Sequence, residues 1–114
     1  MDISAPLKPA ALHILRALAD KASHGYGVMV AVREQSGGRV PLQTGSFYRH
    51  LSKLIDAGLV DEAPRARNAD DPRRGAYYRL TPLGRKVAAA EIARLEAIVE
   101  MARDKKLVPR PRSL

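Results

Sequence analysis

The chain has 114 residues, 46% of them hydrophobic, and a formal net charge of +8 at pH 7. This length fits one compact domain, and the absence of cysteine excludes disulfides and thiolate metal sites and suits a reducing cytoplasm. The apolar runs are shorter than the roughly 20 residues of a membrane span, and we expect no signal peptide, because the start MDISAPLKPA lacks an apolar core. The charge favours a polyanionic partner, nucleic acid before an anionic membrane, although a basic surface can also serve solubility alone.

Two short helices are predicted first. Apolar side chains recur at helical spacing from residue 7 to about residue 20. After a break at residues 21–25, a second helix is expected from about residue 25 to 35, with Ser23 as its N-cap. Its buried side is expected to carry Tyr26, Met29, Val30 and Val32. The pair Gly37-Gly38 is expected to end it.

The third predicted helix has two contrasting faces. Thr44 is expected to cap it, and it runs to about residue 57, where Gly58 supplies a stop. At 100° per residue, Phe47 and three aliphatic residues cluster in one arc. The opposite arc holds mainly small or cationic residues, and Tyr48 lies at the boundary. This outer arc consists of Gly45, Ser46, Arg49, Ser52, Lys53 and Asp56.

The outer arc suits contact with DNA. Arg49 and Lys53 are four residues apart and project together, so their donors can reach phosphates and base edges. The small residues let the backbone approach a surface. An ordinary amphipathic helix with a solvated face is the alternative. The preceding short helix and turn favour a helix-turn-helix with this segment as the recognition helix.

A hairpin is predicted next, with strands at about residues 59–66 and 76–80. Its loop, RARNADDPRRG at residues 65–75, contains Asp-Pro and a final glycine. A basic hairpin beside a helix-turn-helix is a wing, which can follow the DNA backbone or insert an arginine into the minor groove. The predicted DNA contacts of this wing are Arg65, Arg67, Arg73 and Arg74.

The last and longest helix is expected to begin with Thr81 as cap and Pro82 at its first position, and to end near residue 105. It carries a heptad seam with spacing 4, 3, 4, 3, and a second apolar strip beside it. The extra apolar surface predicts a homodimer; burial against the chain's own helices is the alternative. The seam consists of Ala88, Ile92, Leu95, Val99 and Ala102, and the second strip of Val87, Ile98 and Met101.

Four motifs together resemble the PadR family of bacterial transcriptional regulators. They are HGYG at residues 24–27, GSFYRHLSKL at 45–54, GLV at 58–60 and YYRLTPLG at 77–84. The match covers about residues 12–84 and a following helix, as in the short subgroup with one C-terminal dimerisation helix. The resemblance implies a winged helix-turn-helix fold, a homodimer, repression of nearby genes that a small effector lifts, and a Tyr48 that contacts or faces the DNA backbone.

We therefore expect a mainly α (α+β) protein with three parts. Residues 1–81 form a winged helix-turn-helix that binds a palindromic operator in double-stranded DNA, residues 82–106 a dimerisation helix, and residues 107–114 a disordered basic tail. An effector site is expected around Leu12, Ile92, Leu95 and Val99. The alternative function is a winged-helix protein-interaction adaptor that does not read DNA.

Catalysis, a metal site and a cofactor are not expected. The three histidines, at positions 13, 24 and 50, lack the spacing of zinc ligands. The acidic residues form no paired arrangement typical of acid–base catalysis, and glycine motifs that cradle phosphates are missing.

Overall fold

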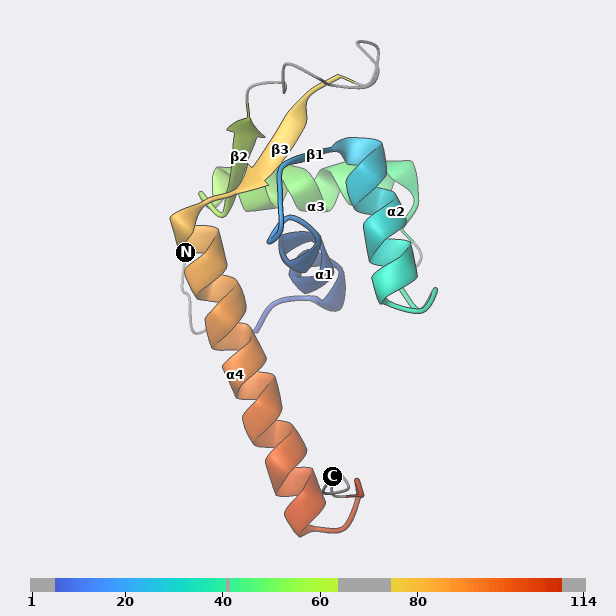
Figure 1. Ribbon diagram of the computed structural model, residues 1–114, viewed down its shortest axis with the longest axis vertical. Coiled ribbons are helices and arrows are strands. Elements are labelled where there is room, and N and C mark those ends of the chain that lie inside the picture. Colours follow the sequence, from blue (N-terminus) through green and yellow to red (C-terminus); the bar gives the residue numbers. More distant parts are fainter. Residues whose placement is uncertain (1–5, 41, 64–74, 110–114) are drawn as a thin grey trace.

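The computed structural model describes residues 6–40, 42–63 and 75–109. In chain order, these residues form a helix, a short strand, two helices, two strands and a long helix (Figure 1). The elements are α1 (Pro9–Ala17), β1 (Ser23–His24), α2 (Gly25–Gln35), α3 (Thr44–Asp56), β2 (Val60–Ala63), β3 (Tyr77–Leu80) and α4 (Pro82–Asp104). The expected class, mainly helical with a small antiparallel hairpin, is confirmed.

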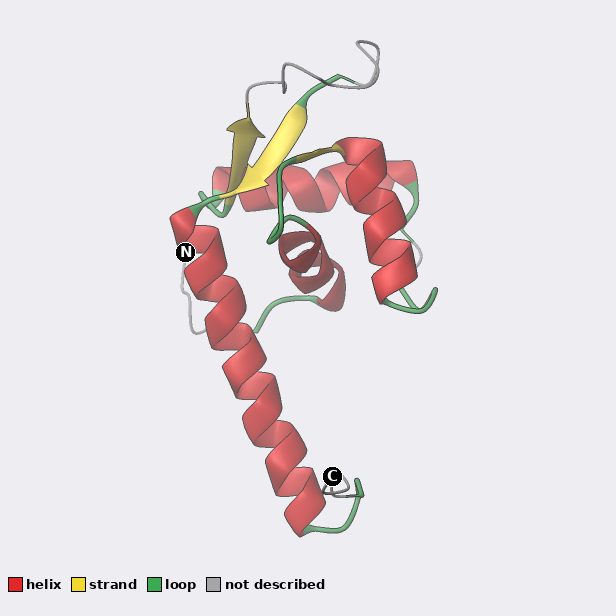
Figure 2. Ribbon diagram, viewed as in Figure 1, coloured by secondary structure: helices red, strands yellow, loops and turns green. Residues whose placement is uncertain are grey.

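The core lies between α1, α2, α3 and the start of α4. Ile14 and Leu15 of α1, Val32 of α2 and Phe47 of α3 are fully buried, and Val87 of α4 is nearly so. Figure 2 shows that the first three helices and the sheet form a compact body, from which the C-terminal half of α4 extends. Among the described residues, no helix is long and apolar enough to cross a membrane.

The sheet has three antiparallel strands in the order β1-β3-β2. In the hairpin, Val60 pairs with Leu80 and Asp61 with Arg79, and the side chains of the latter pair form a 2.7 Å salt bridge. The sequence did not predict β1, because two residues carry no recognisable alternation. It forms because its neighbour β3 offers a free edge to the turn before α2.

Two predicted helix caps are wrong. His24, not Ser23, caps α2, because its Nδ1 accepts a 2.9 Å hydrogen bond from the Gly27 amide. Thr44 is the first residue of α3 rather than its cap; Gln43 has the extended capping conformation, without a side-chain hydrogen bond. The predicted burial of Tyr26 is also wrong, because its side chain is 63% exposed.

The first helix is shorter than the predicted residues 7–20. The Leu7 amide bonds to a carboxylate of α4 instead of entering the helix, so α1 begins at Pro9. At the other end, the chain turns after Ala17 towards β1, and the Ala19 carbonyl accepts a 2.8 Å hydrogen bond from Arg85 of α4. Tertiary contacts therefore decide both ends of this helix.

The end of α3 and the start of α4 are joined closely. Gly58 has a φ of 79°, and the Leu59 amide donates to the Leu54 carbonyl, which ends α3 in a Schellman motif. As predicted, Thr81 caps α4: its Oγ1 accepts from the Gly84 amide at 2.9 Å and donates to the Gly58 carbonyl at 2.6 Å. A methyl group on Gly84 would collide with the Leu59 carbonyl oxygen, so only glycine permits this packing.

Candidate nucleic-acid interface

Helix α3 has the two faces that its sequence predicts. Phe47, Leu51 and Leu54 are buried, and Ile55 is partly buried. The opposite face is open, and its exposed residues are Gly45, Arg49, Ser52, Lys53 and Asp56. Ser46 is half-buried and its hydroxyl donates to the Gln43 carbonyl at 3.3 Å. The apolar back thus holds the helix on the core while the cationic face points outwards.

The tip of α3 allows close approach to a flat or convex partner. A methyl group added at Gly45 would meet no atom within 4 Å. The helix's N-terminal amides lie at the same end, where they favour negative charge. A phosphate backbone can therefore approach the helix closely at Gly45, where no side chain stands in the way.

Tyr48 lies on one flank of α3, between the helix and the rest of the body. It is 45% exposed, and its ring packs edge-to-face on Phe47 with a centroid distance of 4.9 Å. A Cβ at Gly25 would lie 2.5 Å from the Tyr48 hydroxyl oxygen. Gly25, at the start of α2, therefore leaves the space that this hydroxyl occupies, a coupling that the sequence did not reveal.

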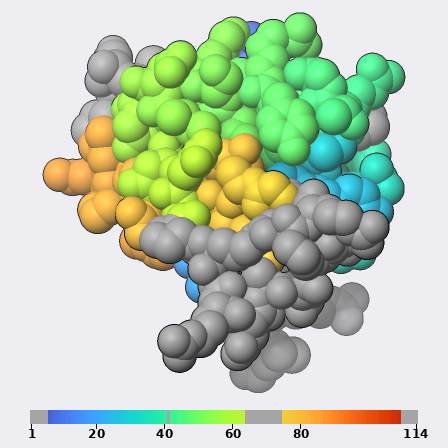
Figure 3. Space-filling model, turned by 90° about the horizontal axis from the view of Figure 1, so that it is seen from above, coloured from blue at the N-terminus to red at the C-terminus, as the bar shows by residue number. Residues whose placement is uncertain are grey.

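The hairpin strands share a face of the molecule with α3. Figure 3 shows green α3 beside the yellow-green and gold strand residues, with the blue start of α2 at their side. The ring of Tyr77 packs edge-to-face on the ring of His24, with a centroid distance of 5.6 Å, and Tyr78 packs partly buried against the core. Burial, and then Tyr48 and Glu62, raise the pKa of Tyr78. The four predicted wing arginines, at positions 65, 67, 73 and 74, lie outside the described residues.

Helix α4 carries apolar side chains beyond the body of the protein. Val87, on the second predicted strip, is buried in the chain's own core. On the seam, Ala88, Leu95 and Ala102 are half-buried, whereas Ile92 is 40% and Val99 38% exposed. Ile98 and Met101 are exposed as well. The chain's own core thus covers the start of the helix and leaves an apolar surface further along it.

Part of this surface borders a groove of about 240 Å³ between α1 and α4. Of the four predicted effector residues, Leu12 and Ile92 line this groove, while Leu95 and Val99 do not. Two cationic side chains, Arg16 and Arg85, complete an otherwise apolar wall. The lining consists of Leu12, Leu15, Arg16, Ala19, Leu80, Arg85, Ala88, Ala89 and Ile92.

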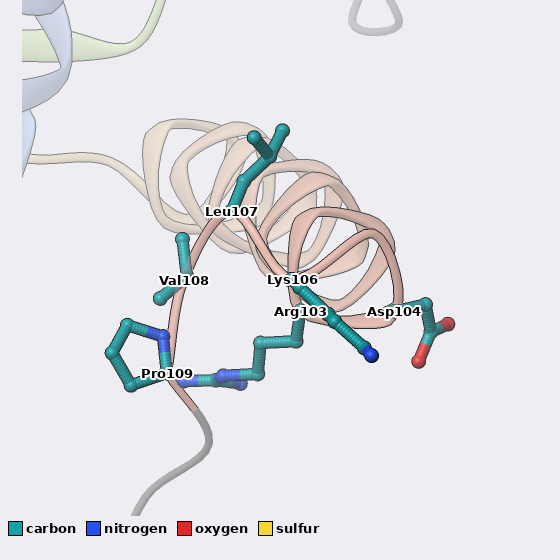
Figure 4. Close-up of a pocket in the computed structure, with 6 residues that line it drawn as sticks. All are labelled: Arg103, Asp104, Lys106, Leu107, Val108 and Pro109. Carbon is teal, nitrogen blue, oxygen red and sulfur yellow. The ribbon is translucent and has the colours of Figure 1, made fainter.

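A second hollow, of about 540 Å³, lies where the chain hooks back after α4 (Figure 4). The Arg103 guanidinium lies beside Pro109 in this hook, and its Nη1 is 3.2 Å from a Glu100 carboxylate oxygen. Lys106 turns the chain with a positive φ of 62°. The hollow is at the opposite end of the molecule from α3 (Figure 1), so it lies far from the candidate nucleic-acid interface.

The family profile described as "Transcriptional regulator PadR-like family" matches residues 14–90, which include α2, α3, the hairpin strands and the start of α4. The chain belongs to this family. The resemblance in the four motifs is thereby confirmed. PadR-like proteins are transcriptional regulators, and comparison with curated proteins finds no match to this one.

Solved structures share the fold of this PadR-like chain. A PadR family transcription regulator from Clostridium difficile R20291 aligns with a TM-score of 0.71 at 20% identity, over 85% of this chain and 97% of that one. A transcriptional regulator from Clostridium thermocellum gives 0.68 at 20% identity, over 83% and 87%. The protein smu.1704 from Streptococcus mutans UA159 gives 0.64 at 21% identity, over 96% and 98%.

Two basic residues near α3 in this PadR-like protein were not among the predicted contacts. His50 follows Arg49 on α3, and Lys8 lies in the segment before α1. The helical wheel places His50 at the edge of the outer arc, but no local signal connects it to Lys8, 42 positions away. Among the described residues, no group of three or more histidine or acidic side chains is placed to hold a metal ion.

Proposed function

We propose that this PadR-like regulator binds double-stranded DNA as a homodimer and represses transcription until a small molecule releases it. The observation that carries the proposal is the exposed cationic face of α3, with Arg49 and Lys53 outward, on a back that is buried in the core. A rigid helix of this kind can enter the major groove and place arginine and lysine donors against guanine edges and phosphates.

The predicted DNA contacts divide into two groups. Gly45, Ser46, Tyr48, Arg49, Ser52 and Lys53 belong to α3. Arg65, Arg67, Arg73 and Arg74 belong to the wing between β2 and β3. Since β2 and β3 lie beside α3, the wing would reach DNA flanking the site that α3 reads. We assign residues 1–81 to the DNA-binding part. We also propose that the protein acts in the cytoplasm.

Dimerisation through α4 gives the regulator a second recognition helix, the α3 of the other protomer. The exposed Ile92 and Val99 support this assignment, because a monomer would leave both seam residues in water. Residues 82–106, which contain α4 (Pro82–Asp104), form the dimerisation part. Two recognition helices related by a two-fold axis match a palindromic operator whose half-sites lie about one helical turn, or a multiple of it, apart.

Effector release would act through the same helix. A small molecule that binds near Leu12 and Ile92, in the groove between α1 and α4, can favour a dimer whose recognition helices no longer fit the operator spacing. The predicted Leu95 and Val99 lie further along α4 towards its end. If no small molecule changes DNA affinity while the protein stays dimeric, effector release is wrong.

The double substitution Arg49→Ala with Lys53→Ala tests the DNA-binding function. We expect it to weaken binding to a duplex from the protein's own promoter by at least tenfold, and to lower the dependence of log K on log salt by about two contacts per protomer, or about four for the dimer. Fluorescence anisotropy over a salt series measures both quantities. Unchanged affinity for a promoter fragment that the wild type binds specifically would favour the adaptor alternative.

A further inference from the structure

A third hollow lies directly beside the recognition helix. It has a volume of about 170 Å³ and separates the segment before α1 from the side of α3. Its lining contains three basic side chains, Lys8, His50 and Lys53, and no carboxylate among the described residues. The complete lining is Pro6, Leu7, Lys8, Ala11, His50, Lys53, Leu54 and Ala57. Cations from two separate parts of the chain therefore meet at one edge of the DNA-facing surface.

His50 and Tyr48 lie on opposite flanks of α3. At 100° per residue they are about 200° apart around the helix, and the Tyr48 flank is the one that contacts Gly25 at the start of α2. A helix in the major groove, which is about 12 Å wide, has a phosphate backbone along each flank. Tyr48 and the neighbouring sheet would face one strand. The hollow with His50 would face the other.

The electrostatics of the hollow favour an anion. Burial, and then the positive charges of Lys8, Lys53 and Arg49, lower the pKa of His50. These three cations surround the imidazole from both the α3 side and the segment before α1. An anion that enters the hollow reduces this repulsion and can accept hydrogen bonds from the lysines and from protonated imidazole.

We propose that Lys8, His50 and Lys53 bind a phosphate of the DNA backbone on the strand that lies away from the sheet. The N-terminal segment then becomes a further DNA contact, in addition to α3 and the wing. This inference rests on the proposed DNA-binding function. Because phosphates carry no sequence information, the site would add affinity and fix the register of α3 without reading bases.

Two residues of α4, Glu91 and Arg94, hold the segment that carries Lys8, and we call this pair the clamp. The Glu91 carboxylate is buried; its Oε2 accepts a 3.1 Å hydrogen bond from the Leu7 amide, and Arg94 binds both oxygens at 2.8 Å. These contacts, led by the hydrogen bond from Arg94, lower the pKa of Glu91. Since Leu7 precedes Lys8, the lysine's place beside α3 depends on the dimerisation helix. Glu91 is therefore a positioning residue for the phosphate site.

The substitution Lys8→Gln tests the site. In full-length protein, we expect the salt slope of DNA binding to fall by about one contact per protomer, or about two for the dimer, and affinity at 0.15 M salt to fall about fivefold. The loss should be equal for a promoter duplex and a scrambled duplex of the same length, because the contact ignores sequence. His50→Gln provides a second variant on α3. The matched control is Lys105→Gln, which removes the same charge at the far end of α4.

The outcomes separate this site from the general function. If the wild-type protein binds neither the promoter duplex nor the scrambled duplex, the proposed DNA-binding function is wrong. If the wild-type protein binds DNA and the Lys8→Gln variant keeps the full salt slope, the phosphate site is wrong, whereas the proposed DNA-binding function stands. A loss confined to the promoter duplex also overturns it, since that result would indicate base reading.

The clamp has its own test. Glu91→Gln is expected to reduce the salt slope by about one contact per protomer, with no further loss when Lys8→Gln is added, because both changes remove the same contact. The control is Glu100→Gln, the acidic partner of the other α4 arginine pair, with Arg103. A lowered melting temperature with an unchanged salt slope would make Glu91 a structural residue only. If Glu91→Gln does not fold, Lys8→Gln and His50→Gln still decide the site.

Discussion

His50 lies on α3 in surroundings that disfavour its charge. Burial and the cations Lys8, Lys53 and Arg49 lower its pKa, so the free protein holds a neutral imidazole over more of the pH range than an isolated histidine. A bound phosphate has the opposite effect, because a nearby negative charge favours the protonated ring. The pKa of His50 is therefore expected to be higher in the DNA complex than in the free protein.

In the proposed DNA complex, this difference would make the affinity for DNA depend on pH. The complex binds more protons than the free protein between the two pKa values, so affinity should rise as pH falls from 8 to 6. We expect a several-fold rise for wild type and a flatter profile for His50→Gln, measured by anisotropy at constant ionic strength. His13→Gln is the control, because burial and Arg16 lower the pKa of His13 as well, but His13 pairs with Arg16 on α1. Equal profiles for wild type and His50→Gln would contradict the assignment.

At the scale of elements, one junction holds the end of α3 to the start of α4. Gly58 and Leu59 end α3, Thr81 bonds to the Gly58 carbonyl, and Gly84 brings the first turn of α4 against Leu59. We therefore expect a shift of α4 to move the end of α3. In the proposed dimer, this contact would provide a physical route by which a change in the arrangement of α4 reaches the proposed DNA-binding surface.

Gly84→Ala tests the junction. The added methyl would overlap the Leu59 carbonyl oxygen, and because that atom belongs to the backbone it cannot turn aside. We expect a loss of about 1–3 kcal/mol in the free energy of unfolding, measured by urea denaturation. The control is Gly45→Ala, whose methyl meets no atom within 4 Å and which should leave stability unchanged or raise it by up to about 1 kcal/mol. If Gly84→Ala were as stable as the wild-type protein, α3 and α4 would not be packed as closely as this contact indicates.

At the scale of the whole molecule, α4 divides into two parts. Its first half is anchored to the body by Val87, Arg85 and Glu91. Its second half extends from the body with apolar residues exposed (Figure 1). A second copy is the simplest cover for this half, and it would place the two α3 helices on one assembly.

Val99→Glu tests the dimer. A carboxylate buried without a partner costs several kcal/mol, so we expect the dimer dissociation constant to rise roughly 100-fold or more. Analytical ultracentrifugation measures the association state, and operator affinity should fall with it. The control is Ala97→Glu, which places the same charge on an exposed position on the other side of α4. If Val99→Glu remains a dimer at micromolar concentration, the proposed seam is wrong.

The sequence alone determined that four helices and a hairpin form, and it determined the two faces of α3, because these depend on local periodicity and helix-ending residues. The apolar arc with Phe47, the Gly58 stop and the Thr81 cap were all predictable, and the four motifs indicated the family. These signals lie within a few residues of one another, and hydrogen bonding and burial act on them locally.

Only the tertiary structure decided how distant residues meet. In the folded protein, the Leu7 amide bonds to the Glu91 carboxylate. This contact shortens α1 and places Lys8 beside His50. Pairing with β3 created β1, and the His24 side chain became the α2 cap in place of Ser23. Such contacts join segments up to 84 positions apart. They depend on how the helices pack rather than on any local pattern, so the sequence carried no signal for them.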